Sequence, residues 1–161
     1  LAECTNRAGA IRRVPDVVWH SKAKSMETTK DTKNTKEKIE FDALSREVIG
    51  CSIEVHRELG PGLLESAYQQ CLAHELNTRG IKFQTEMQIP VHYKGVRLDC
   101  GFRADFMIGE AFILELKSVE KLTAIHQAQL LTYMKLCTCR TGLLINFNVK
   151  HLRDGIKRFV L

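Results

Sequence analysis

The chain has 161 residues and a formal net charge of +5, and 44% of its residues are hydrophobic. This length suits one domain with a real core, and the composition is ordinary for a globular protein. No stretch approaches the ~18 consecutive apolar residues of a membrane span, and the first residues lack the charged-then-apolar pattern of a secretory signal. We therefore expect one globular domain and no membrane partner.

Residues 1–40 differ in composition from the rest. From Ser21 to Lys38 the chain is almost entirely polar, and such a segment buries too little surface to offset the entropy lost on ordering. We expect a disordered or non-domain tail at 1–40 and the folded domain at 41–161. The small apolar island from Ile11 to Trp19 has three interpretations: a docking peptide, a remnant of a targeting segment, or a vector-encoded or mistranslated sequence.

The domain begins with two expected helices. Asp42 or Ser45 can cap the first, which the Gly60-Pro61-Gly62 break ends. The second covers about Leu63 to Arg79, with Tyr68, Leu72 and Leu76 at helical spacing along one stripe.

Alternating and continuous apolar runs then predict strands, with a turn at Lys94-Gly95. The expected elements are strands at 81–93, 96–108 and 112–119, a helix at 123–136, a strand at 142–147, and a short strand or helix at 155–161. The order α-α-β-β-β-α-β indicates an α/β (α+β) fold, in which helices flank a mixed sheet.

The second and third strands form an expected hairpin around Gly109-Glu110 that carries charged residues. Glu115 and Lys117 share one face of their strand because side chains alternate. With a turn centred near Gly109-Glu110, Asp105 lies opposite Leu114 or Glu115, and a three-residue or bulged loop would place it beside Glu115. Two carboxylates and an amine on an apolar sheet are costly unless they are paired or bind a metal.

This pattern has two interpretations of similar weight. Carboxylates, waters and phosphate oxygens are the ligands that Mg²⁺ prefers, and a nearby lysine stabilises developing negative charge. The constellation therefore suits metal-assisted phosphodiester hydrolysis. The alternative is a buried salt bridge inside a sheet.

Four further residues could have either a structural or a functional role. The structural role of Glu65, in the first turn of a helix, is to complement the helix dipole with its charge. Gln129 and Tyr133 are four residues apart on one helix face, and their structural interpretation is a surface tyrosine capped by the glutamine. Arg103 lies two residues before Asp105 and would either contact a phosphate or pair with the carboxylates.

Charge and cysteine usage add to the functional prediction. Residues 41–120 hold 8 basic and 12 acidic residues, whereas residues 121–161 hold 7 basic and 1 acidic. The basic end could grip a phosphate-bearing partner while the acidic middle holds metal.

The six cysteines lack C-x-x-C spacing, so we expect free thiols and a cytoplasmic or other reducing compartment. No histidine belongs to a metal-ligating motif.

Together these residues resemble the GxxExxY family of the PD-(D/E)XK nuclease superfamily. The matching elements are Gly62, Glu65 and Tyr68 of G-x-x-E-x-x-Y, the motif aspartate Asp105, Glu115-Leu116-Lys117 as E-x-K, and Gln129 and Tyr133 as Q-x-x-x-Y. The resemblance covers about residues 42–161. One departure is Ala104, which stands where the superfamily pattern has proline.

The resemblance implies a restriction-endonuclease-like core and Mg²⁺- or Mn²⁺-dependent cleavage of nucleic acid, with DNA the first expectation. It implies that Asp105, Glu115 and Glu65 are catalytic metal ligands and Lys117 the catalytic lysine. Substrate-binding or supporting roles fall to Gln129, Tyr133, Tyr68 and Arg103. The alternative function is a non-catalytic module that binds nucleic acid or protein on the same fold, and a homodimer or a protein partner stays open.

Overall fold

The computed structural model describes residues 30–110 and 112–161, and within them the side chains of all but residues 30–42 and 100. The elements along this part of the chain are α1 Lys30–Leu59, α2 Glu65–Thr78, β1 Phe83–Tyr93, β2 Val96–Ile108, β3 Phe112–Lys117, α3 Ala124–Leu136, β4 Thr141–Asn146, the 3-10 helix η1 Leu152–Gly155 and β5 Ile156–Val160.

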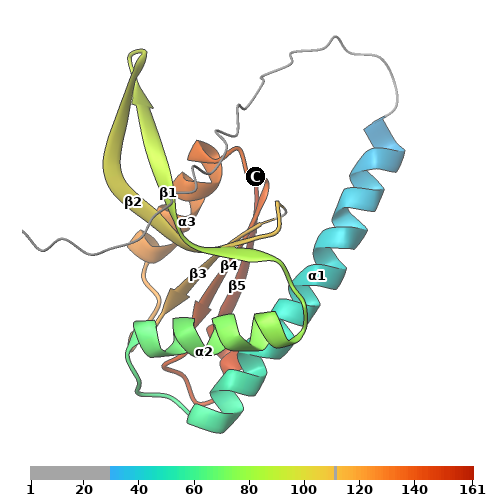
Figure 1. Ribbon diagram of the computed structural model, residues 1–161, viewed down its shortest axis with the longest axis vertical. Coiled ribbons are helices and arrows are strands. Elements are labelled where there is room, and N and C mark those ends of the chain that lie inside the picture. Colours follow the sequence, from blue (N-terminus) through green and yellow to red (C-terminus); the bar gives the residue numbers. More distant parts are fainter. Residues whose placement is uncertain (1–29, 111) are drawn as a thin grey trace, which may run out of the picture.

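The strands form one mixed sheet in the order β1-β2-β3-β4-β5. β3 and β4 pair in parallel, and the other neighbouring strands pair antiparallel. Every β3 side chain from Phe112 to Lys117 is buried, as expected for a central strand with both faces covered. Figure 1 shows α1 and α2 lying across one face of the sheet and α3 behind the other. The predicted mixed sheet flanked by helices is therefore confirmed.

Two apolar clusters fill the space between the sheet and the helices. Leu114 and Leu116 of β3 belong to the cluster beneath α1 and α2, which includes Tyr68 and Leu72. Ile113 belongs to the other cluster, which packs against α3. Successive β3 residues thus face opposite layers, so the alternation of a strand side chain decides which helix layer it meets.

Most element boundaries agree with the expectations from sequence. The predicted turn at Lys94-Gly95 connects β1 and β2, and the stripe Tyr68, Leu72 and Leu76 is completely buried. The chain end forms both a 3-10 helix and the strand β5, where either one alone was expected.

The start of the first helix was predicted wrongly. α1 begins at Lys30, and neither Asp42 nor Ser45 caps it. Ser45 lies inside the helix, is fully buried, and accepts a hydrogen bond of 2.9 Å from Arg158. The polar stretch before residue 41 contains no Gly or Pro, so its backbone continues the helix without a local stop. The tail prediction for residues 1–29 lies outside the described residues.

The described thiols agree with the expected chemistry. Cys51, Cys71, Cys137 and Cys139 are free, and burial raises the pKa of the Cys137 thiol to about 11. Cys4 and the Cys100 side chain lie outside the described part. Among the described residues, no helix is both long and apolar enough to cross a membrane.

We predict that Gly155→Ala destabilises the fold. A Cβ atom there would overlap the Asn146 carbonyl oxygen and approach Val149 Cγ2 to 3.1 Å. The carbonyl belongs to the backbone at the end of β4 and has little freedom to move. We expect a loss of about 1–3 kcal/mol or more, measured by urea unfolding. The control is Gly50→Ala in α1, where the nearest atom is the flexible Arg79 guanidinium and helix propensity should offset the contact. Equal stability of Gly155→Ala and the wild type would contradict the packing.

Candidate active site

The candidate site lies where β2 and β3 part. Their pairing runs from Ile108↔Phe112 to Phe106↔Leu114 and then ends. Beyond it, the Leu116 amide donates a hydrogen bond of 2.7 Å to Asp105 Oδ2. A carboxylate thus takes the place of a backbone carbonyl. The connection at 109–111 is three residues long, the one of the two open alternatives that places Asp105 beside Glu115.

Glu115 and Lys117 form a buried ion pair at the end of β3. Lys117 Nζ donates to Glu115 Oε1 at 2.7 Å and to the Leu116 carbonyl at 2.8 Å. Only 2% of the Glu115 side chain and 10% of the Lys117 side chain are exposed. Glu115 Oε2 is buried and has no hydrogen-bond partner. Burying a carboxylate oxygen without a partner costs folding free energy, and a bound cation would offset that cost.

The site holds more negative charge than Lys117 can balance. Burial, and then the Asp105 charge, raises the pKa of Glu115 to about 7. Burial also raises the pKa of Asp105, although the Leu116 amide and Lys117 act in the opposite direction. Burial alone would lower the pKa of Lys117, but the neighbouring Glu115 carboxylate more than offsets this and raises it. All three groups therefore hold protons more tightly than usual: the two carboxyl groups mainly because they are buried, and the ammonium because carboxylates surround it.

Glu65 adds a third carboxylate from the start of α2. Its Oε1 lies 3.7 Å from Lys117 Nζ, and 42% of its side chain is exposed. Glu65 is the first residue of the helix, as expected, but its nearest charged partner is the site lysine. Glu65 thus forms the solvent-facing side of a site whose floor is Glu115.

Two side chains fix the loop that leads into Glu65. The Tyr68 hydroxyl donates to the Gly60 carbonyl at 2.6 Å and accepts from the Leu63 amide at 3.1 Å. Ser118 donates to the Leu63 carbonyl at 2.6 Å. Gly60 and Gly62 have φ values of 66° and 102°, which favour glycine. Tyr68 is fully buried and stacks on Phe147 with ring centroids 4.4 Å apart, so its position fits a supporting role.

Gln129 and Tyr133 lie on the helix that covers the Glu115 face of the sheet. Gln129 Nε2 donates to the Tyr133 hydroxyl at 2.8 Å. Tyr133 is buried in the cluster under α3, so it is not the capped surface tyrosine of the alternative interpretation. Its ring centroid lies 6.2 Å from that of Phe102 on β2. Within the described residues, no hydrogen bond joins this pair to Asp105 or Glu115.

Arg103 was expected to lie on the same side of β2 as Asp105, and the strand geometry does not support that premise. Ala104 packs under α3, whereas Phe106 packs under α1 and α2. Two residues that should share a face therefore face opposite layers. Arg103 instead pairs with the exposed Glu86 at 2.8 Å.

The residues present fit a hard divalent ion. Mg²⁺ is usually held by one or two carboxylates and completed by water and phosphate oxygens. Asp105 and Glu115 supply two carboxyl groups, and the buried Glu115 Oε2 has no other partner. Among the described side chains, no group of three His, Cys, Asp or Glu residues is arranged to hold a metal. The expected role of Glu65 as a further ligand beside Asp105 and Glu115 stays a prediction.

Sequence reasoning missed two supporting residues. Gln69 donates from Nε2 to the Asp105 carbonyl at 3.3 Å. Asn146 is buried at the end of β4, opposite Lys117. Its side chain binds the Val119 amide and carbonyl at 3.0 and 2.8 Å. Neither residue belongs to a recognisable spacing pattern, so only the fold identifies them.

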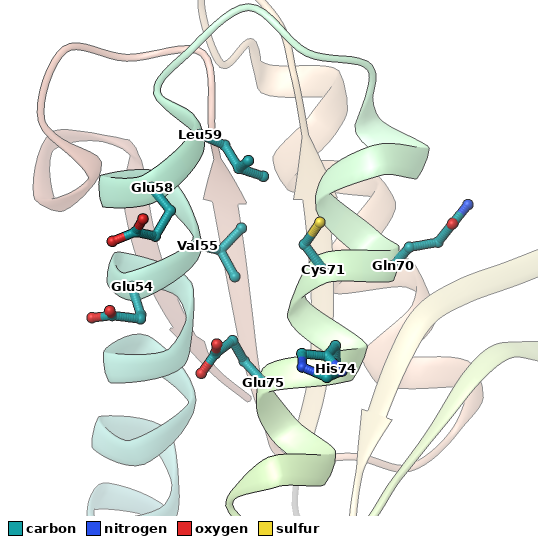
Figure 2. Close-up of a pocket in the computed structure, with 8 residues that line it drawn as sticks. All are labelled: Glu54, Val55, Glu58, Leu59, Gln70, Cys71, His74 and Glu75. Atoms are coloured by element: carbon teal, nitrogen blue, oxygen red, sulfur yellow. The ribbon is translucent and has the colours of Figure 1, made fainter.

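A separate hollow of about 320 Å³ lies between α1 and α2. Figure 2 shows Val55, Leu59 and Cys71 around this space, with Glu54 and Glu75 nearby. None of the residues that line it belongs to the candidate site. Arg57 pairs with Glu54 and also with Glu58, so part of its acidic rim is already neutralised.

Comparison with known families agrees with this geometry. Residues 42–159 match the family model described as the PD-(D/E)XK nuclease superfamily. The match covers most of the chain, so the chain belongs to this superfamily. Searches of curated proteins and of solved structures found no match.

The raised pKa of Glu115 predicts a pH-dependent stability in EDTA. Such a carboxyl stabilises the folded state fully below its ordinary pKa of 4.5, and this contribution is lost as pH rises through about 7. Glu115→Gln should therefore become more stable relative to the wild type between these pH values, by on the order of 1–3 kcal/mol. Urea unfolding at several pH values measures the difference, with Glu110→Gln in the exposed turn as the control. A difference in unfolding free energy between Glu115→Gln and the wild type that does not change with pH would contradict the raised pKa of Glu115.

Proposed function

We propose that the protein is a metal-dependent nuclease that hydrolyses phosphodiester bonds, with DNA as the first substrate to test. The observation that carries this proposal is the unpartnered, buried Glu115 Oε2 next to Asp105 and Lys117. The superfamily supplies the reaction class, and the geometry supplies the candidate groups. The match of Gly62, Glu65 and Tyr68 to G-x-x-E-x-x-Y supports a finer proposal, membership of the GxxExxY family.

Asp105 and Glu115 would hold the ion through the carboxylate oxygens that face away from their present partners. Oδ2 of Asp105 is engaged by the Leu116 amide, which fixes the orientation of that carboxyl group and leaves Oδ1. Oε1 of Glu115 is engaged by Lys117, which leaves Oε2. When bound, Mg²⁺ or Mn²⁺ supplies a Lewis acid that neutralises phosphate charge and acidifies water.

Lys117 has one donor left for the reaction. An ammonium group has three N–H donors, and two are used by Glu115 Oε1 and the Leu116 carbonyl. The third is free to orient the attacking water or contact a non-bridging phosphate oxygen. As water attacks phosphorus and the bond to the leaving oxygen breaks, negative charge builds up on the phosphoryl oxygens. A fixed ammonium stabilises this charge most in the transition state.

Glu65 supports a different step. Its half-exposed carboxylate lies close to Lys117, where it helps keep the ammonium protonated and can accept a hydrogen bond from water at the open side. The loop contacts of Tyr68 and Ser118 hold Glu65 in this position. Gln129 and Tyr133 support the face that carries Glu115.

The first test is stabilisation by metal. Mn²⁺ binds only the folded site and should raise the melting temperature. The rise should be larger at pH 8 than at pH 6, because the ion must displace protons from carboxyls whose pKa values are raised. Thermal unfolding in EDTA and in Mn²⁺ measures the shift.

Asp105→Asn should abolish this metal-dependent rise, whereas Glu110→Gln in the exposed β2–β3 turn should keep it. The opposite pattern, a full rise in Asp105→Asn, would exclude Asp105 as a ligand. Asp105→Asn should also be no less stable than the wild type in EDTA at pH 8, because it removes one charge from a repulsive group.

The second test is the substitution Lys117→Met, which keeps the aliphatic stem and removes the charge. At saturating metal, single-turnover cleavage of labelled DNA should slow by ~10²-fold or more, the usual scale for one such electrostatic contact. Substrate affinity in Ca²⁺ should change much less. Lys117→Arg should restore little, because a planar guanidinium does not replace a compact ammonium.

Lys82→Met is the matched control, because Lys82 is exposed and lies outside both the candidate site and the basic segment at 121–161. It should cleave like the wild type. A non-catalytic module would show lower stability in Lys117→Met and no metal-dependent cleavage in any of the three proteins. Unchanged cleavage by Lys117→Met would place the active site elsewhere.

A further inference from the structure

The β1–β2 hairpin extends beyond the rest of the sheet. β3 pairs only with the last residues of β2, from Phe106 to Ile108, so the more distal parts of β1 and β2 pair with each other alone. Figure 1 shows this two-stranded ribbon projecting from the body past α3. Its tip is the turn Lys94-Gly95, where both residues have positive φ, 48° and 80°, as in the tight turns that close twisted hairpins.

A bulge divides the ribbon into a covered base and an exposed end. The pairing shifts between Ile89↔Phe102 and Val91↔Leu98. Gly101, inside the bulge, has φ 73°, a conformation that favours glycine at bulges. Ile89 is buried under α3, whereas residues 92–99 beyond it are exposed.

The exposed end carries an apolar stripe. Val91 and Tyr93 follow Ile89 at the two-residue spacing of one strand face, and their cross-strand partners are Leu98 and Val96. Tyr93 is 59% exposed, Val96 56% and Leu98 40%. The stripe thus continues, on β1, the face that α3 covers nearer the body.

This face leads back towards the candidate site. Phe102 is 43% exposed, and its ring contacts Tyr133 of the Gln129–Tyr133 pair. Ile113 of β3 lies in the same cluster, and Glu115 and Lys117 follow Ile113 on the same face of that strand. The exposed ribbon face and the site carboxylates are therefore on one side of the sheet.

The chemistry of the ribbon fits an unpaired nucleic acid strand. Two exposed rings lie on this face. Phe102 pairs with Ile89 across the ribbon, and Tyr93 lies four residues beyond Ile89 on β1, so the two rings are about 13 Å apart along the strands. Lys94 Nζ lies 5.3 Å from the centroid of the Tyr93 ring, so a cation accompanies the outer ring. Rings that stack on bases beside cations that meet phosphates characterise proteins that bind single strands. A duplex presents phosphates and base edges instead of base faces, and it leaves such rings without stacking partners.

We propose that this ribbon binds single-stranded nucleic acid, with bases stacked on Tyr93 and Phe102 and a phosphate at Lys94, and guides the strand to the site. The proposal rests on the proposed function in that the bound strand is its substrate. Binding is measured in EDTA, without cleavage, so the two proposals succeed or fail separately.

The experiment measures the affinity of the full chain for a fluorescent 20-nucleotide oligothymidine and for a duplex of equal length. Tyr93→Ala and Phe102→Ala should each weaken single-strand binding by about 5- to 150-fold, the range for losing one stacked base. Tyr93→Phe should bind like the wild type. Lys94→Met should reduce the dependence of log affinity on log salt by about one. Duplex affinity should be weaker and unchanged in all variants.

Val160→Ala is the matched control, since Val160 is 70% exposed on β5 at the other edge of the sheet. Equal losses in this variant, unchanged binding in both ring variants, or no single-strand binding by the wild type would overturn the proposal.

Sedimentation of the same proteins tests whether a second copy of the chain occupies the apolar stripe instead. A wild-type dimer that Tyr93→Ala dissociates, without loss of oligonucleotide affinity, would assign the stripe to self-association. Ring-dependent binding without any metal-dependent cleavage would keep the ribbon proposal and reject the nuclease proposal.

Discussion

The central constraint in this structure is that one amine must balance several carboxyl groups inside an apolar sheet. β3 is buried along its whole length, yet it carries Glu115 and Lys117, and Asp105 reaches it from the neighbouring strand. The ion pair alone would be neutral. Asp105 and Glu65 make the group negative, and burial, with the neighbouring carboxylates adding to it, raises the pKa values of Asp105 and Glu115. The site is therefore built to attract protons or a cation, and the surrounding fold must hold it against its own repulsion.

The order of the elements could be predicted from sequence because the spacing of apolar residues differs between helices and strands. The apolar runs of β3 and β4 predicted strands, and the structure adds that the two pair in parallel between the helical layers. The boundary that failed is the start of α1. No Gly or Pro stops that helix before residue 41, and the expected cap Ser45 is instead a buried partner of Arg158. A hydrogen bond across 113 positions of the chain leaves no local signal in the sequence.

The candidate site was only partly accessible to the same reasoning. The sequence left Asp105 opposite either Leu114 or Glu115, because the register of a hairpin depends on the exact length of its loop. The proximity of Glu65 to Lys117 required the whole fold, because α2 reaches β3 only through tertiary packing. Alternation failed at Asp105, where β2 changes the layer that it faces between Ala104 and Phe106. The end of the β2–β3 pairing therefore creates the site. It also interrupts the alternation of side chains in β2, so alternation could not predict which side of the sheet Arg103 and Asp105 face.

Stability alone does not explain why these charges are present. Well-packed apolar residues in place of a buried ion pair are often neutral or stabilising, and the neighbours Leu114 and Leu116 show that β3 accommodates apolar side chains at the adjacent positions. A structural salt bridge would also leave no carboxylate oxygen without a partner, yet Glu115 Oε2 has none. The excess carboxylates converge at the end of β3, where the half-exposed Glu65 opens the site to solvent. Groups that cost folding energy and face one accessible point are what the proposed cation and substrate site would require.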